Sequence, residues 1–314
     1  MPSKKHEPRL IVAVVLCVSL ASCASVPRAT RPAEAYFDML PPGPTAYLAL
    51  DLVSTRELVP GVAAQLGLPA RELAEGLRRA RAVYAGILLR EGASPEVSAI
   101  VAGEFPPAGV RASLCLLRAD WRRVADGEVW HENRGSGMQI AATEPDYLLV
   151  STGHIKDSIA AARHPAAAPV PAAVLALASR NDLLVFLPSL PAGQEAFGAG
   201  KAPPVLEMWL TATRAGELTT AGDALSAPLE ISLGFRLAGE REARLFRPVL
   251  RLLLLGMVRQ GRLPGGSEAL STLRDEVEGD VVRLTGLRMT VGEALKTAQG
   301  LLGGGGTSGG SSSG

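Results

Sequence analysis

Residues 229–237 show the clearest alternation of apolar and polar side chains in the chain. Five apolar side chains would share one face of a strand there, and four polar or small side chains would share the other. Such a strand is typical of an antiparallel sheet with one face on a core and one face toward water. Weaker patterns predict strands at 45–52, 83–89, 97–105, 128–132, 138–143, 147–151, 183–187, 206–212 and 280–289.

Helical spacing is strongest over residues 241–261. Apolar side chains recur there at intervals of three and four from Phe246 to Met257, and arginines lie mostly on the opposite side. Pro248 lies inside this segment, so either the helix starts near Leu245 or it is kinked. Further helices are expected at 54–82 (with a break at 67–69), 108–117, 154–163, 172–179, 268–276 and 291–302.

This order of elements predicts an α+β fold of antiparallel sheets with packed helices. Residues 45–163 and 172–302 run through a similar order of elements, which predicts two similar tandem halves. The Pro- and Ala-rich residues 164–171 would link them. Residues 303–314 contain only Gly, Ser and one Thr, and we expect them to form a disordered tail.

The first 22 residues have the three parts of a secretory signal peptide. Basic residues come first, an apolar run follows at 10–20, and the small residues Ala21 and Ser22 come last. A stable membrane-spanning helix needs roughly 20 apolar residues. The run is shorter than that and suits a cleaved signal peptide.

The order Leu20-Ala21-Ser22-Cys23 resembles the lipobox of bacterial lipoproteins. In that family the cysteine thiol receives a diacylglyceryl group, the leader is cut before the cysteine, and the new amino group is acylated. The resemblance covers only the leader, and it implies lipidation of Cys23 and loss of residues 1–22. Cys17 is the weaker candidate because no small residues precede it. Two or three acyl chains anchor a protein stably, at about 0.8 kcal/mol per buried methylene.

The same resemblance implies a place in the bacterial cell envelope, with the membrane as a partner through the lipid on Cys23. No Asp follows the cysteine, which resembles lipoproteins that are sent on to the outer membrane, facing the periplasm in a diderm host. Residues 23–44 would form a lipidated tether. Its distal part, 36–40, is expected to dock on the body.

Charge and cysteine content narrow the classes of partner. The leader carries three of the 32 Lys/Arg and one of the 31 Asp/Glu residues, which leaves 29 and 30 in the mature chain. This balance argues against nucleic acid, which normally selects a basic surface. Cys115 would be the one free thiol of the mature chain, and its leucine neighbours favour a buried position.

No motif for catalysis, a cofactor or a metal survives inspection. Residues 306–310 match the nucleophile-elbow pattern only inside the Gly/Ser tail, where the required strand and helix are missing. Residues 198–201 lack most of a P-loop. His131, His154 and His164 are scattered and are expected to be surface or strand-end residues. Six aromatic side chains could line a carbohydrate or lipid site, but packing is favoured: Trp121, Trp130, Trp209, Tyr47, Tyr84 and Tyr147.

We therefore predict a lipid-anchored envelope protein that acts by binding or scaffolding. Its partner would be a hydrophobic ligand or an envelope protein, with no catalytic residue, cofactor or metal. The alternative is a membrane-anchored hydrolase whose site is assembled from residues distant in sequence. An apolar groove favours the binder, and a pocket of clustered Asp, Glu, His or Ser favours the enzyme.

Overall fold

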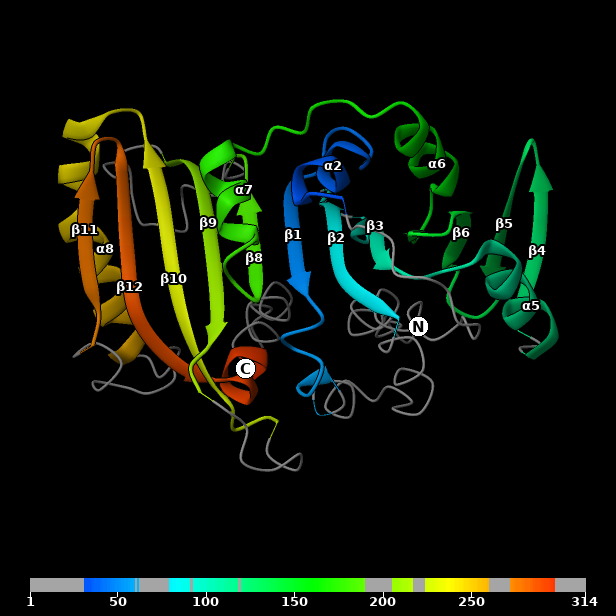
Figure 1. Cartoon of the computed structure of the whole chain (residues 1–314). Coiled ribbons are helices and arrows are strands. Elements are labelled where there is room, and N and C mark those ends of the chain that lie inside the picture. The colour runs from blue at the N-terminus through cyan, green and yellow to red at the C-terminus, as the bar shows by residue number, and fades with distance from the viewer. Residues whose placement is uncertain are drawn as a thin grey trace, which may run out of the picture.

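A computed structural model of the chain describes residues 31–59, 61, 79–90, 93–117, 120–189, 205–216, 224–259 and 272–296. Within these ranges the strands form one twelve-stranded sheet, in the order β11-β12-β10-β9-β8-β1-β2-β3-β7-β6-β5-β4 (Figure 1). All neighbouring strands in it pair antiparallel. The predicted α+β class with antiparallel strands is confirmed.

The strands are β1 Ala46–Asp51, β2 Ala80–Leu88, β3 Glu96–Gly103, β4 Trp121–Asp126, β5 Glu128–Asn133, β6 Gln139–Glu144, β7 Tyr147–Ser151, β8 Leu183–Leu187, β9 Val205–Arg214, β10 Pro228–Leu237, β11 Arg274–Glu278 and β12 Val281–Thr290. The helices are α2 Ala33–Asp38, α5 Pro107–Leu117, α6 Ile155–Arg163, α7 Ala172–Ala178 and α8 Glu240–Arg259. Residues 291–296 are also helical.

The sheet is continuous because β1 and β8 pair at its centre. Tyr47 of β1 lies opposite Phe186 of β8 on one side and Gly86 of β2 on the other. The strand order is β1-β2-β3-β7 in one direction and β8-β9-β10-β12 in the other. Along the chain, α5 follows β3 and α8 follows β10, so a helix comes after the third strand of each group. Tandem duplication stays a prediction, which superposing the two halves would test.

Helices cover both faces of the sheet, because strand side chains alternate between two cores. Tyr47 and Ala49 belong to a core with residues of α2, α6 and α7. Leu48 and Leu50 point the other way, toward residues of α5. α8 covers β10 and β12 with Phe246 and its neighbours, and Figure 1 shows this helix and α7 on opposite sides of the sheet.

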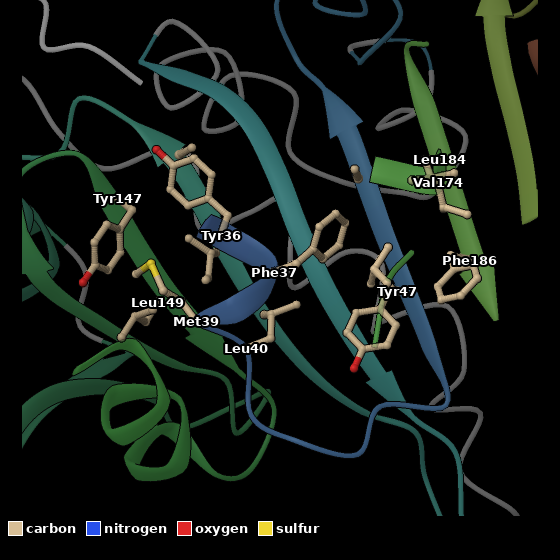
Figure 2. Close-up of a cluster of buried hydrophobic side chains, with 14 of the residues drawn as sticks. Tyr36, Phe37, Met39, Leu40, Tyr47, Tyr147, Leu149, Val174, Leu184 and Phe186 are labelled. Atoms are coloured by element: carbon tan, nitrogen blue, oxygen red, sulfur yellow. The ribbon is translucent and has the colours of Figure 1, made fainter. Parts of the chain in front are cut away.

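The segment before β1 docks on the sheet through aromatic side chains. Tyr36 stacks on Tyr84 of β2 with ring centroids 4.8 Å apart, and Phe37 meets Tyr47 and Tyr84 edge-on at 5.9 and 5.4 Å. Edge-to-face and offset contacts of this kind stabilise beyond simple burial. Figure 2 shows Tyr36, Phe37 and Leu40 spread along this core, so the predicted docking of residues 36–40 is confirmed.

One sequence prediction about the C-terminal elements was wrong in the part that the structure describes. Residues 274–276 of the helix predicted at 268–276 belong to β11, in which Asp275 is buried between the exposed Arg274 and Glu276, and residues 268–271 lie outside the described residues. Because the acidic Asp275 points inward, charged residues occupy both faces of this strand, and the alternation of apolar and polar residues that would indicate a strand is lost. The helix predicted at 241–261 is α8, which starts at residue 240 with Pro248 in its interior, so the alternative start near Leu245 is ruled out.

Three further features of the structure differ from what the sequence predicted. β4 was missed because only its first residue, Trp121, is fully buried in this edge strand. His131 is buried rather than exposed, and desolvation by burial lowers its pKa, with Arg123 and Arg111 adding to the effect. The polar face of β10 is not open to water at Gly234, which is buried beneath Trp209. The side chain of Cys115 lies outside the described residues.

Candidate functional site

A cavity of about 960 Å³ lies between α2, α6 and the sheet, and we name it the α2–α6 cavity. Its floor comes from β1, β2 and β3, and its rim from the loop 41–44 and the linker 164–169. Figure 1 shows that linker passing from α6 to α7 across the ends of the central strands. The volume is within the range of about 300–1,000 Å³ that is usual for small-molecule sites.

Most of the wall is apolar. Phe37 and Leu40 line it from α2 and the turn that follows, Tyr47 from β1, and Leu88 from β2. Burial raises the pKa of Tyr47 to about 12, so its phenol stays neutral and adds no charge to the wall. Small and rigid side chains complete the lining at Pro41, Pro42, Pro44, Ala160, Ala161, Ala166, Ala167, Ala168 and Pro169.

A glycine in β2 sets the position of the loop 41–44. A Cβ on Gly86 would lie 2.7 Å from Cγ of Pro44 and 3.7 Å from Cδ1 of Leu40. Contacts below 3.0 Å do not occur between real side chains, so the loop lies this close only because residue 86 has no side chain. The loop is held from its other end as well, since the backbone N–H of Thr45 donates to the carbonyl of Ile87 at 2.8 Å.

The linker is fastened to the end of α2 by Asp38. The Oδ1 atom of Asp38 accepts a hydrogen bond from the backbone N–H of Ala168 at 2.8 Å, and its carbonyl accepts one from Ala166 at 3.0 Å. Two bonds from one residue fix the linker as a wall of the cavity. The Pro- and Ala-rich stretch that the sequence indicated as a linker therefore also contributes to the site.

α6 is held in place by apolar contacts and by a charged seam to the β4–β5 hairpin. Ile155 and Ile159 are buried beneath the helix. Lys156 pairs with Asp126 and lies 5.5 Å from the ring centroid of Trp130. Arg163 pairs with Glu128 through two hydrogen bonds, one of 2.7 Å. The opposite side of α6 contributes Asp157, Ala160 and Ala161 to the cavity.

Three of the polar side chains that line the cavity lie together: Arg90, Glu96 and His154. The Glu96 carboxylate accepts a hydrogen bond from Arg90 at 2.9 Å, and His154 Nε2 lies 3.7 Å from its other oxygen. Asp157 and His164 also line the cavity. Among the described residues, no group of three or more His, Cys, Asp or Glu side chains could hold a metal ion. The arrangement is a mostly apolar hollow with an ion-paired cluster around Glu96 in its wall.

The residues singled out from the sequence fall in different places. Cys23 and Cys17 lie outside the described residues. Trp121, Trp130 and Trp209 are each only 7% exposed, which confirms the packing interpretation for the tryptophans. Tyr47 belongs both to the core and to the cavity wall. His154 and His164, which were expected to be ordinary surface or strand-end residues, both line the cavity.

The alanines and prolines of the wall were missed as site residues. Their signal in the sequence was the Pro content of 41–44 and the Pro and Ala content of 164–171, which is equally typical of a linker.

Similarity to known proteins is limited to the fold. No protein-family model matches the chain, and no curated protein matches it significantly by sequence. The crystal structures of TP0453 in forms III and I cover 88% of this chain and 99% of that chain, with TM-scores of 0.58 and 0.57 and 12% identity. Crystal form IV gives 0.57 at the same identity, covering 86% and 97%. At this identity the match shows a shared fold alone.

Within the described ranges, none of the helices combines the length and apolar character that crossing a bilayer requires.

Proposed function

We propose that the chain is a lipid-anchored protein of the bacterial envelope that binds an apolar or amphiphilic ligand in the α2–α6 cavity. The lipobox-like leader supports the anchor, and the cavity supports the binding activity. The single observation that carries the binding claim is a cavity of about 960 Å³ whose wall is mostly aliphatic and aromatic. Such a site excludes water from apolar surface and gains affinity by burying the ligand.

The lining supports an amphiphile better than a hydrocarbon or a hydrolysable substrate. Its wall carries one polar cluster, in which Glu96 is engaged by Arg90 and lies near His154. A ligand with a polar head and an apolar body would match both parts of the cavity. The hydrolase alternative has less support: Ser98 lines the cavity, but the hydrogen bond that involves its hydroxyl is with Ser158, at 3.3 Å, rather than with a histidine or carboxylate base.

The anchor is tested by metabolic labelling with a radioactive fatty acid. The wild-type chain should incorporate label, and Cys23→Ala should abolish both labelling and cleavage of the leader. Cys17→Ala is the matched control, because it removes the other leader cysteine, and it should be labelled normally. Normal labelling of Cys23→Ala would disprove the anchor without bearing on the cavity.

The binding claim is tested by titrating the protein with cis-parinaric acid and displacing it with oleate. Wild type should bind saturably. Ala161→Trp, which puts an indole into the cavity from α6, should weaken binding by about tenfold or more, because the added ring occupies the ligand's volume. Ala176→Trp on the exposed surface of α7 is the control and should bind like wild type. Equal binding by both variants would refute the assignment of the cavity.

A further inference from the structure

The outer surface of α8 exposes large apolar side chains. Leu245, Leu252 and Leu255 are 57%, 68% and 42% exposed, although the helix buries Phe246 and Leu250 on its inner side. At about 100° per residue the three exposed leucines fall within roughly 80° of one another around the helix axis. They form one stripe, which we name the α8 ridge. An ordinary surface helix places polar side chains in this position.

Arginines lie beyond both ends of the α8 ridge, at Arg241 and Arg259. α8 contains five arginines and two glutamates, both of which lie in its first turn. Arg244 pairs with Glu240 one turn away. By helical spacing, Arg241 and Arg259 lie on the same outward side as Leu252. The outer surface of α8 therefore combines exposed leucines with an excess of positive charge.

A buried carboxylate fixes which side of α8 faces outward. The side chain of Asp275 in β11 is 2% exposed, and it accepts hydrogen bonds from Arg247 and Arg251. Burial alone would raise the pKa of Asp275, but these hydrogen bonds and charges outweigh it and lower the pKa. Together with Phe246 beneath the helix, this clamp prevents α8 from turning the α8 ridge toward the sheet.

We propose that the α8 ridge is a membrane-contact surface for anionic lipid. Leucine side chains would enter the boundary between headgroups and acyl chains, and the arginines would meet the phosphates, as in helices that lie in the plane of a membrane. Charge complementarity selects this partner over a second copy of the chain, because a twofold contact through α8 would bring arginines together. The contact is independent of the α2–α6 cavity and adds to any lipid on Cys23.

The test uses residues 24–314, which lack the lipidation site and include every described element. The protein is sedimented with vesicles of phosphatidylcholine alone or of phosphatidylcholine with phosphatidylglycerol. Wild type should bind the anionic vesicles at least about tenfold more strongly, and added salt should weaken the binding. Equal binding to both vesicles, or none to either, would overturn the proposal.

Variants separate the apolar and the charged parts of the α8 ridge. The triple variant Leu245→Ser, Leu252→Ser and Leu255→Ser should lose about tenfold or more of the binding, and Arg241→Glu with Arg244→Glu should lose the preference for anionic vesicles. Leu206→Ser removes an exposed leucine of β9 and is the matched control. Wild-type binding by both α8 variants would overturn the proposal.

Two further measurements distinguish membrane contact by the α8 ridge from ligand binding in the α2–α6 cavity and from self-association. Ala161→Trp should bind vesicles like wild type, so failure of the α2–α6 cavity and failure of the α8 ridge give different results. Sedimentation without vesicles reports the oligomeric state. A dimer that the triple serine variant breaks would identify the α8 ridge as a self-association surface and refute the membrane contact.

Discussion

Gly234 of β10 is a position where one added methyl group should clearly lower the free energy of unfolding. It lies opposite Trp209 of β9, and the indole crosses the space where a side chain would begin. A Cβ on residue 234 would lie 2.0, 2.2 and 2.3 Å from the Cε2, Cζ2 and Nε1 atoms of the ring. Trp209 is itself 7% exposed and packs in the core, so the ring has little room to move.

The expected magnitude follows from two opposing effects. Overpacking a core costs about 1–3 kcal/mol, and the overlap with three ring atoms places Gly234→Ala toward the upper end. Replacing glycine by alanine inside a strand returns about 0.5–1 kcal/mol through lower chain entropy in the unfolded state. We therefore expect Gly234→Ala to destabilise the protein by about 2 kcal/mol. In a Trp209→Leu background the clash is absent, and the same change should be neutral or stabilising by about 0.5 kcal/mol.

Urea unfolding followed by far-ultraviolet circular dichroism measures all four proteins of this double-mutant cycle. Tryptophan fluorescence would be unsuitable because Trp209 is changed. The coupling energy between the two positions should be about 2 kcal/mol, with similar slopes in urea. Additivity within about 0.5 kcal/mol would refute the argument that Gly234 is required by the indole.

Two predictions concern the cavity wall and the α8 clamp. Gly86→Ala should push the loop 41–44 away from β2. This change should lower the urea midpoint and change the affinity for cis-parinaric acid. An unchanged midpoint and affinity would show that the loop does not rest on β2. Asp275→Asn should lower the urea midpoint more than Glu276→Gln on the exposed side of β11. The pKa of Asp275 is lowered in the folded protein, so its contribution is complete above the ordinary value of 3.8 and disappears as pH falls through the lowered value. The gap between wild type and Asp275→Asn should therefore close in acid, and a gap that widens there would contradict the clamp.

The local pattern of apolar residues was sufficient to predict the position of four elements. The strands at 147–151 and 183–187 have the predicted bounds, and β10 and α8 lie within a residue or two of their predictions. β7 and β8 are short, nearly continuous apolar runs, whereas β10 and α8 carry apolar side chains at the spacing of a strand and of a helix, so local pattern and tertiary burial agree.

The pattern failed where burial depends on a distant partner. Asp275 is inward because Arg247 and Arg251 neutralise it from α8, and no local rule indicates that pairing. β4 is an edge strand that buries little, so its apolar signal is weak. Neither error changes the class of fold, but the first conceals the clamp that orients α8.

The candidate site was less predictable than the fold. Most of its wall consists of Ala, Pro and other apolar side chains, which form no recognisable motif. These residues lie between positions 37 and 169, and they come together only because β1, β2 and β3 pair and α6 packs above them. Gly86 illustrates the difficulty, because a glycine in a strand does not reveal which loop will lie against it. The leader carried a chemical prediction because the modification of a lipobox cysteine depends on adjacent residues alone.

The most direct test of the account is photo-crosslinking of the full-length chain, processed in bacterial membranes, with a fatty acid that carries a diazirine on its acyl chain. Mass spectrometry then maps the labelled peptides. We expect label on residues 37–47 and 154–169, which line the α2–α6 cavity, and a loss of that label in Ala161→Trp but not in Ala176→Trp. Label spread over other surfaces, or undiminished label at these residues in Ala161→Trp, would contradict the assignment of the cavity as a ligand site.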